Sequence, residues 1–320
     1  MLRNLAVLLL MIVNLTCWAK DDNPAYTNAE DGGVEFQIQG EYLGDIDGES
    51  WGGHVIALGD GKFKVVGYQG GLPGDGWSRG DETRGGEGKL DGSKAVFHLD
   101  EVTLTVDGKT LEIESDGGNL ASLKKVNRKS PTLGAKPPEG ATILFDGSSV
   151  DAFENGKITE DKLLAATGVQ SKATFGDHRL HLEFRTPFMP KSKGQARGNS
   201  GMYVQSRYEV QVLDSFGLDG KDNECGGIYS INEPIVNMCY PPLSWQTYDY
   251  EFTAARYDDA GKKTKNARIT VKHNGTVIHD DLELIHGTPG RFAEGPEKQG
   301  LFLQDHGNPV VFRNIWVVEK

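Results

Sequence analysis

The sequence predicts an all-β protein whose larger, C-terminal part is a two-sheet antiparallel jelly-roll sandwich. Glycine is abundant, with 42 among 320 residues, and helical periodicity is scarce. Short segments of alternating polar and apolar residues are separated by turn residues. Two of these turns, Asp107-Gly108 and Asn274-Gly275, are pairs that two-residue hairpins favour. Together these observations favour many short strands joined by tight turns.

The first 19 residues have the pattern of a secretory signal peptide. Arg3 precedes an apolar run over residues 5–13, and the triplet Cys17-Trp18-Ala19 offers a cleavage site before Lys20. The run is too short to span a bilayer of about 30 Å. We therefore expect export to the periplasm or the extracellular space, with retention as an anchor as the alternative. No later run is long and apolar enough to be a membrane helix.

The composition also limits the partners and the chemistry. The formal net charge is −12, so the surface repels polyanions and nucleic acid is excluded as a partner. After signal removal only Cys225 and Cys239 remain, and in an oxidising compartment we expect them to form a disulfide worth roughly 3 kcal/mol. Two buried thiols are the alternative. With no nearby His pair, these cysteines make a poor zinc site.

Residues 20–128 predict a small all-β domain, a barrel or a sandwich, whose role the sequence does not disclose. Two hairpins are expected in it, over residues 55–68 and 103–113. Between them lies a Gly-rich loop over 70–88 that contains Trp77. This tryptophan either caps a small core or stacks on a sugar ring.

Residues 129–140 separate this domain from the next. The segment contains several prolines and no apolar periodicity, which favours an extended, partly stiff linker. Residues 141–320 then form the second domain. Its strand candidates suit two packed antiparallel sheets, and they lie at 180–185, 201–206, 209–213, 248–254, 268–273, 276–280 and 310–318.

The most informative part of this domain is the segment 198–215. In its second strand Glu209 and Gln211 share one face, while Tyr208, Val210 and Val212 share the other. One face is thus free to line a polar cleft. Sugars need such a surface, because each hydroxyl must be paired once water is removed.

Several motifs of this domain occur together in one known family. They are Leu144-Phe145-Asp146-Gly147, Asn199-Ser200-Gly201-Met202-Tyr203, the strand 208–214, Gly226-Gly227-Ile228-Tyr229, Trp245-Gln246-Thr247-Tyr248 and the segment 304–315 that begins Gln304-Asp305-His306-Gly307. With them, residues 141–320 resemble the 3-keto-disaccharide hydrolase domain family, a secreted jelly-roll group related in shape to concanavalin-like lectins and laminarinase-like glucanases. The resemblance implies cleavage of glycosides whose sugar carries a ketone at carbon 3.

An ordinary glycosidase mechanism is poorly supported by the central strand. Such enzymes use two carboxylates, and the laminarinase-like relatives place acidic residues at positions i, i+2 and i+4 of a strand. Here these positions hold Glu209, Gln211 and Leu213. A 3-keto sugar removes the need for the pair, because its ketone makes the proton on carbon 2 acidic and one base can start an elimination. Water then adds to complete net hydrolysis.

The hypothesis is that Glu209 or His306 is the base and the other is the acid. The residues assigned to substrate binding are Asn199, Gln211, Tyr229, Trp245, Gln304, Asp305 and Arg313. No cofactor is required, and a divalent metal is left open. The triplet His279-Asp280-Asp281 looks metal-like, but neighbours on a strand point to opposite faces.

Each assignment has a structural alternative. For Glu209 the alternative is a half-buried carboxylate paired with Arg207 or Arg313. For His306 it is an imidazole that only fixes its own loop. Arg313 is then a structural ion-pair member, and Trp316 lies in the core with Phe312 and Val318. Two other functions also stay open, namely a non-catalytic carbohydrate-binding module and an ordinary two-carboxylate glycoside hydrolase.

Overall fold

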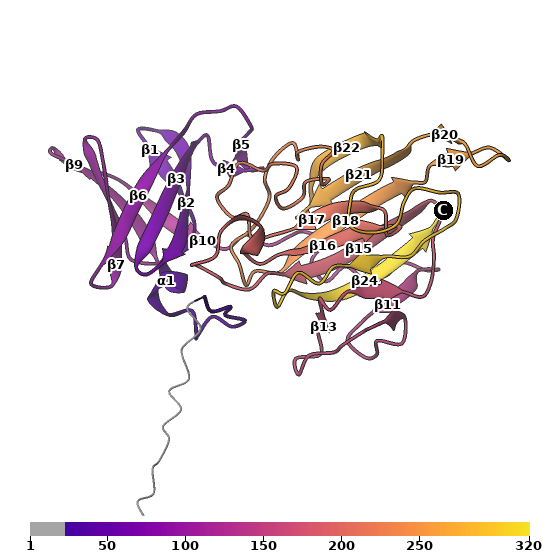
Figure 1. The fold of residues 1–320 in the computed structure, drawn as a ribbon. Coiled ribbons are helices and arrows are strands. Elements are labelled where there is room, and N and C mark those ends of the chain that lie inside the picture. The colour runs from indigo at the N-terminus through magenta and orange to yellow at the C-terminus, as the bar shows by residue number, and fades with distance from the viewer. Residues whose placement is uncertain (1–22) are drawn as a thin grey trace, which may run out of the picture.

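The computed structural model describes residues 23–320, which form a β-barrel and a β-sandwich lying end to end (Figure 1). The expected signal peptide and its cleavage site lie outside the described residues. Among residues 23–320, no helix is long and apolar enough to cross a membrane. The all-β fold class predicted from the sequence is confirmed, with a jelly-roll-like sandwich preceded by a smaller all-β domain.

The N-terminal strands close into a barrel, one of the two architectures left open by the sequence. A short helix, α1 (Gly33–Ile38), precedes it. In order around the barrel the strands are β1 (Gly40–Ile46), β10 (Gly118–Val126), β9 (Thr110–Ser115), β8 (Val102–Val106), β7 (Lys94–Leu99), β6 (Thr83–Asp91), β3 (Lys62–Gln69) and β2 (Glu49–Gly59). Closure leaves no unpaired sheet edge. Gly88 permits it locally, because a Cβ there would lie 2.4 Å from the ring of buried Phe97.

The sandwich consists of a seven-stranded and a five-stranded sheet. The larger sheet runs β11 (Thr142–Phe145), β24 (Val311–Glu319), β15 (His178–Arg185), β18 (Gln246–Thr253), β21 (Ala267–His273) and β22 (Thr276–Leu284), with β13 (Leu164–Ala165) also paired to β24. The smaller sheet runs β12 (Phe153–Glu154), β14 (Val169–Ser171), β23 (Phe302–Leu303), β16 (Ser200–Val204) and β17 (Tyr208–Val212). The apolar side chains of the two inner faces form one core.

Short elements complete the chain. They are β4 (Leu72–Pro73), β5 (Gly76–Trp77), the 3₁₀ turn η1 (Gly194–Ala196), β19 (Arg256–Tyr257) and β20 (Lys263–Lys265). The predicted Asn274-Gly275 hairpin joins β21 to β22. Both residues have positive φ, 50° and 83°, as a two-residue hairpin turn of this kind requires.

The predicted disulfide is not present. Cys225 and Cys239 are free and buried. Each thiol has a hydrogen-bond partner of its own: Cys225 Sγ lies 3.3 Å from Tyr248 Oη, and Cys239 Sγ donates to Leu213 O at 3.5 Å. The structure therefore matches the alternative to the disulfide, namely two buried thiols that each have a hydrogen-bond partner.

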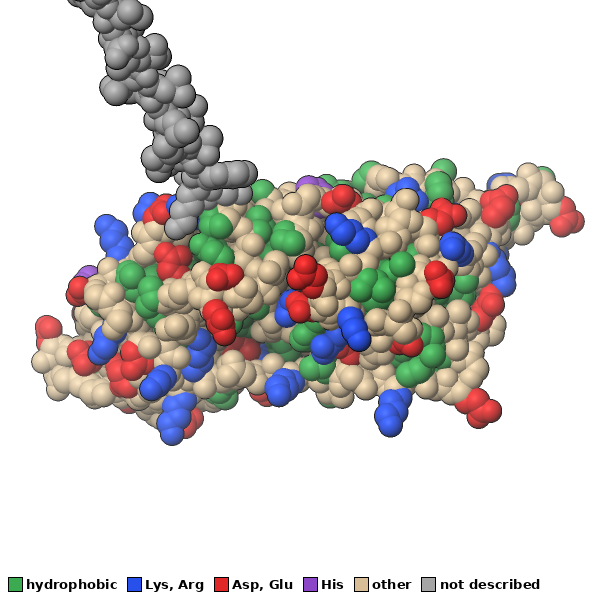
Figure 2. Space-filling view, turned by 90° about the horizontal axis from the view of Figure 1, so that it is seen from below, with side chains coloured by type: hydrophobic (Ala, Val, Ile, Leu, Met, Phe, Trp, Pro, Cys, Tyr) green, Lys and Arg blue, Asp and Glu red, His purple; other side chains and the backbone are tan. Residues whose placement is uncertain are grey.

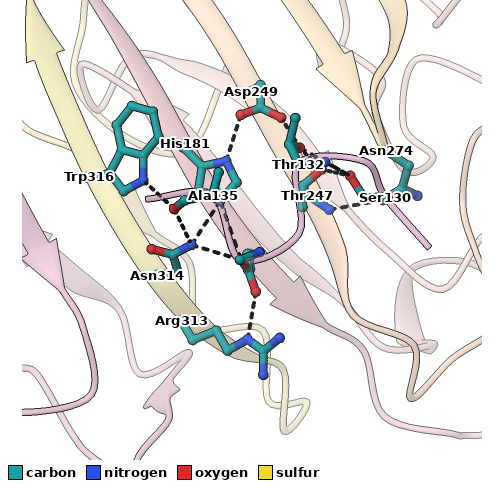
Figure 3. Close-up of polar contacts among 12 residues, drawn as sticks. Ser130, Thr132, Ala135, His181, Thr247, Asp249, Asn274, Arg313, Asn314 and Trp316 are labelled. Carbon is teal, nitrogen blue, oxygen red and sulfur yellow. Dashed lines mark hydrogen bonds and ion pairs between the residues drawn. The ribbon is translucent and has the colours of Figure 1, made fainter. Parts of the chain in front are cut away.

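The linker departs from the expected extended connector, because it packs on the outer face of the seven-stranded sheet (Figure 3). Ser130 Oγ lies 2.6 Å from Thr247 Oγ1, and Thr132 Oγ1 donates to Asp249 Oδ2 at 2.6 Å. Further along, Ala135 O accepts hydrogen bonds from the side chains of Asn314 and Trp316. Polar side chains on this face therefore hold a segment whose own sequence has little to bury.

Glu183 is the centre of this attachment. Its carboxylate is buried and accepts hydrogen bonds from Gly134 N at 2.6 Å, Arg313 Nε at 2.7 Å and Asn314 Nδ2 at 2.9 Å. Burial raises the pKa of Glu183, but hydrogen bonds from His181 and these groups outweigh it and lower the pKa to about 2. The buried His181 ring is desolvated, yet its contacts with Asp249 and Glu183 raise its pKa overall.

We predict that Glu183→Gln destabilises the protein by about 3–5 kcal/mol near pH 6, because it leaves buried cationic groups without their counter-charge. The carboxylate of Glu183 contributes above its ordinary pKa of 4.5 and is lost toward pH 2. The imidazolium of His181 contributes below 6.5 and is lost as pH rises. The attachment is thus strongest between these values, and urea midpoints measured from pH 2.5 to 8.5 test this.

Glu251→Gln is the matched control, because Glu251 pairs with Lys320 on the exposed part of the same sheet. We expect it to cost less than about 1 kcal/mol. Equal losses for the two variants, or a loss for Glu183→Gln that does not shrink at pH 2.5, would contradict the role given to Glu183.

Candidate active site

A row of side chains crosses the outer face of the five-stranded sheet. Glu209 on β17 lies opposite Tyr203 on β16, Tyr203 lies opposite Phe302 on β23, and Phe302 lies opposite Gln170 on β14. Their strand neighbours on the inner face are core residues, so alternation turns this row outward. The sequence predicted this face for Glu209, and the structure adds the three residues that continue it.

A second row lies beside the first. Gln211 faces Gly201 across the β17–β16 ladder, and Gln304 N donates to Gly201 O at 2.9 Å. Gly201 leaves room for the carboxylate in this position, because a Cβ here would lie 2.2 Å from Glu209 Oε1 and would force the side chain to move. The Glu209 carboxylate therefore lies over the glycine, between Gln211 and Gln304.

Glu209 is in an environment that favours a proton. Glu209 is only 3% exposed, and this burial raises the pKa of its carboxyl group to about 7. Tyr203 Oη donates a hydrogen bond to Oε2 at 2.9 Å, which lowers the pKa but does not outweigh burial. Neither a cation nor a second carboxylate contributes to the shift. The other oxygen, Oε1, accepts no hydrogen bond from the described residues and keeps some solvent contact. The carboxylate thus has one oxygen fixed and one free to accept a proton.

The phenol of Tyr203 contacts this carboxylate, and the amide of Gln304 lies next to the phenol. Tyr203 Oη also contacts Pro289 O at 3.3 Å, and Gln304 Nε2 lies 3.4 Å from the same hydroxyl. Burial and the nearby Glu209 and Tyr229 raise the pKa of Tyr203, so its phenol stays protonated. Tyr229 N donates to Glu209 O at 3.2 Å. Of these groups, Tyr229 and Gln304 were predicted from the sequence and Tyr203 was not, although Tyr203 shares a strand face with Gly201.

The loop between β22 and β23 runs along the row from β17 to β14. Thr288 Oγ1 accepts a hydrogen bond from Glu209 N at 2.9 Å. Arg291 stacks over the Phe302 ring at 3.8 Å and donates to Gln170 Oε1 at 2.8 Å. This places an exposed guanidinium at the far end of the row from Glu209. The sequence gave no periodic signal in this loop, and neither residue was predicted.

Asn199 and Gln211 meet at Gln195 of η1. Asn199 Nδ2 donates to Gln195 O at 2.7 Å and to its Oε1 at 3.0 Å, while Gln211 Nε2 donates to the same Oε1 at 3.2 Å. Asn308 Oδ1 accepts from Asn199 N at 2.7 Å. Asn199 Oδ1 is buried without a hydrogen-bond partner among the described residues. It is an acceptor in this cluster that still lacks a donor.

Arg313 and Trp245 do not belong to this site, which corrects their assignment. β24 lies in the larger sheet, so Arg313 points from the opposite outer face of the sandwich. There its guanidinium stacks on Trp245 at 3.8 Å and donates from Nε to Glu183. Arg313 is a structural ion-pair member, the alternative stated for it. Nor does an arginine pair with Glu209, whose only side-chain partner among the described residues is Tyr203.

The predicted core position of Trp316 is also wrong. Asn314 has φ of 47°, and the register between β15 and β24 shifts beside it. The irregularity turns both Phe312 and Ile315 into the core, so that Trp316 faces outward and donates to Ala135 O at 3.3 Å. Figure 3 shows the indole over the linker.

His306 and Asp305 lie in the exposed loop that follows Gln304. His306 makes no hydrogen bond or ion pair with Glu209 or with any other described residue. Asp305 Oδ1 accepts from Gly307 N at 2.9 Å, so its carboxylate shapes its own loop. The assignment of His306 and Glu209 as acid and base does not need a direct contact between them and stays a prediction.

No three His, Cys, Asp or Glu side chains gather closely enough to hold a metal ion within residues 23–320. His279, in the metal-like triplet, instead lies with Nε2 2.7 Å from Gly226 O, and burial lowers its pKa to about 4. Two hollows lie away from Glu209, which lines neither of them. One of about 530 Å³ is formed between barrel and sandwich, and one of about 690 Å³ lies beside Glu183 and Arg313.

Comparison with known proteins agrees with this fold. A solved structure of a "putative glycosyl hydrolase" from Parabacteroides distasonis, at 2.13 Å resolution, is 29% identical to this chain, and the match covers 57% of this chain and 85% of the other with a TM-score of 0.53. A second "putative glycosyl hydrolase" of the same organism, at 1.70 Å resolution, is 18% identical over 57% and 94% of the two chains with a TM-score of 0.42. None of the curated proteins matches the chain.

The family profile of the 3-keto-alpha-glucoside-1,2-lyase-like domain matches residues 140–318, which include the whole sandwich up to the last residues of β24. This match covers more than half of the chain and contains every residue of the site around Glu209. The protein therefore belongs to the 3-keto-alpha-glucoside-1,2-lyase-like domain family.

Proposed function

We propose that this protein cleaves glycosides whose sugar carries a ketone at carbon 3, by elimination across carbons 1 and 2 followed by hydration. Family membership supports a glycoside-cleaving function, and so does the similarity to the "putative glycosyl hydrolase" from Parabacteroides distasonis. The preference for an oxidised sugar is argued from the site.

The observation that carries the proposal is a single carboxylate with a pKa near neutrality. The pKa of Glu209 is about 7, and no second carboxylate contributes to it. Direct glycoside hydrolysis needs two carboxyl groups at defined separations, but the next outward position of β17 is the amide of Gln211. A lone general base with a pKa close to the working pH suits proton abstraction from carbon 2 of a 3-keto sugar.

The first step moves one proton and one electron pair. Glu209 Oε1 accepts the proton from carbon 2, and the electrons of that C–H bond move toward the ketone oxygen to give an enolate. The donors assigned to this oxygen are Gln304, whose Nε2 lies 3.4 Å from Tyr203 Oη, and the phenol of Tyr229, which is near enough to Tyr203 to raise its pKa. Tyr203 holds Glu209 Oε2 throughout and orients the carboxylate.

The second step breaks the bond between carbon 1 and the glycosidic oxygen. The enolate electrons form the double bond between carbons 1 and 2, and the departing oxygen takes a proton from His306, which has no partner among the described residues. Water then adds its hydroxyl to carbon 1 while its other proton goes to His306, and Glu209 returns its proton to carbon 2, so both groups recover their starting protonation. The sum of these steps is hydrolysis, without oxidant or reductant.

We predict that Glu209→Gln lowers the release of aglycone from an aryl 3-keto-glucoside by about 10²–10⁴-fold, because the amide cannot accept the proton. Glu294→Gln is the matched control. Glu294 also accepts a hydrogen bond from a strand tyrosine, Tyr208 Oη at 2.6 Å, but on the other side of the sheet edge. The control should keep most of the activity.

Product analysis separates the competing functions. A transient unsaturated sugar, or deuterium incorporated from heavy water at carbon 2, supports elimination and hydration. Turnover that Glu209→Gln leaves unchanged removes Glu209 from the mechanism. Binding of the 3-keto-glucoside without any turnover identifies a carbohydrate-binding module, and equal cleavage of the unoxidised glucoside identifies an ordinary hydrolase.

We also predict that kcat/KM falls about tenfold per pH unit below pH 7, because protonation of Glu209 removes the base. The raised pKa has the opposite sign for stability: ionising Glu209 in the fold is unfavourable, so its cost appears as pH rises from 4.5 through 7. Glu209→Gln should therefore unfold at higher temperature than the wild type at pH 8, with the gap closing toward pH 4.5. A base-limited rate with a midpoint below pH 5 would contradict the assignment.

A further inference from the structure

We propose that the hollow between barrel and sandwich is a second carbohydrate-binding site, one that takes a neutral oligosaccharide. Its volume is about 530 Å³, within the range of ligand pockets, which also occur preferentially between domains. The site does not include Glu209 and does not depend on the reaction proposed above.

Both domains contribute walls to the hollow. The barrel supplies the outer side of β3 and β6 and the Gly-rich loop that contains β4 and β5, which lies between barrel and sandwich in Figure 1. The sandwich supplies residues 217–219 and Asn237. Since β17 ends at Val212, the strand that carries Glu209 continues within a few residues into this wall.

The walls are held in place without a ligand. Arg79 on the barrel loop donates hydrogen bonds to backbone carbonyls of the sandwich: Asp219 O at 3.0 Å, Gly220 O at 2.8 Å and Pro234 O at 2.9 Å. On the same loop Gly74 lies against Met238, where a Cβ would be 2.2 Å from Sδ. A hollow bounded by such contacts is preorganised, so ordering its walls would cost little conformational entropy when a ligand binds.

An aromatic side chain lies in the wall. Trp77 is half-buried, and its ring packs edge-on against Tyr68 at 5.1 Å. The sequence left open whether this tryptophan caps a core or stacks on a sugar. In the structure one side of Trp77 packs against the sandwich core and the other side lines the hollow. A large, rigid amphipathic ring of this kind is suited to the apolar face of a pyranose.

Polar groups in the wall still lack partners. The side chains of Lys64, Thr83 and Asp219 make no hydrogen bond or ion pair with any of residues 23–320. A carboxylate accepts hydroxyl hydrogens, an ammonium donates to hydroxyl oxygens, and a threonine does both. Around one tryptophan, this set can pair several hydroxyls of a sugar chain.

The charges argue against other ligand classes. The lining carries both signs of charge: Lys64, Arg79 and Arg84 are cationic, and Asp81 and Asp219 are anionic. A polyanion would therefore meet two carboxylates, and an apolar ligand would leave the charges of Lys64 and Asp219 unpaired. Acidic and basic side chains are also interspersed on the face in Figure 2, without a large patch of one sign. With a net charge of −12 for the chain, a neutral polyhydroxylated ligand fits best.

The test is calorimetric titration of the full chain with unoxidised glucose hexasaccharides of β-1,4, β-1,3 and α-1,4 linkage, and with heparin. At least one hexasaccharide should bind. Trp77→Ala and Asp219→Asn should each weaken binding about tenfold or more, as expected for anchor residues. Trp245→Ala is the matched control, because this half-buried tryptophan lies on the sandwich outside the hollow, and it should leave binding unchanged.

Binding is measured without turnover, so this result does not depend on the proposed reaction. Trp77→Ala should also keep the wild-type rate on a small 3-keto-glucoside. If Trp77→Ala does not fold, Asp219→Asn, at an exposed position, decides alone. No binding of any hexasaccharide, binding lost in Glu209→Gln but kept in Asp219→Asn, or preference for heparin would each overturn the proposal.

Discussion

The buried carboxylate of Glu183 is the interaction on which the arrangement of the sandwich and its linker depends. Taking a carboxylate out of water costs several kcal/mol unless donors replace the water. Here the donors come from the linker backbone at Gly134 and from Arg313, Asn314 and His181 on the sheet. Satisfying one charge thus fixes the path of the linker, the local irregularity of β24 and the position of the arginine that the sequence had placed in the active site.

Glu183 and Glu209 show how opposite environments give two glutamates opposite tasks. Both are buried on outward faces of the sandwich, one on each sheet. Several donors lower the pKa of Glu183 to about 2, so it stays ionised and structural. Glu209 has only the Tyr203 phenol, and burial raises its pKa to about 7. It therefore exchanges a proton near neutrality, which is the property a catalytic base needs.

Much of the fold could be predicted, because strand alternation and turn chemistry are local. The two-residue period placed Glu209 and Gln211 on the outer face correctly. Tyr203 was missed because its place opposite Glu209 depends on hairpin register, and this turn carries no glycine although Gln205 and Ser206 have positive φ. Bulges, a docked linker and the sheet to which a strand belongs all depend on tertiary contacts, for which one sequence has no local signal.

The amide at position 211 is part of the same chemistry as the carboxylate at 209. Outward neighbours on a strand lie roughly 6.6–6.8 Å apart, so an acidic residue at 211 would disfavour ionisation of Glu209 and raise its pKa further. A base that stays protonated at neutral pH is of no use for proton abstraction. Gln211 avoids this repulsion and, through Gln195, ties the strand to Asn199. In the proposed mechanism the site therefore lacks the second carboxylate of ordinary glycosidases and relies on a single base with a pKa of about 7, which suffices if the substrate ketone supplies the missing activation.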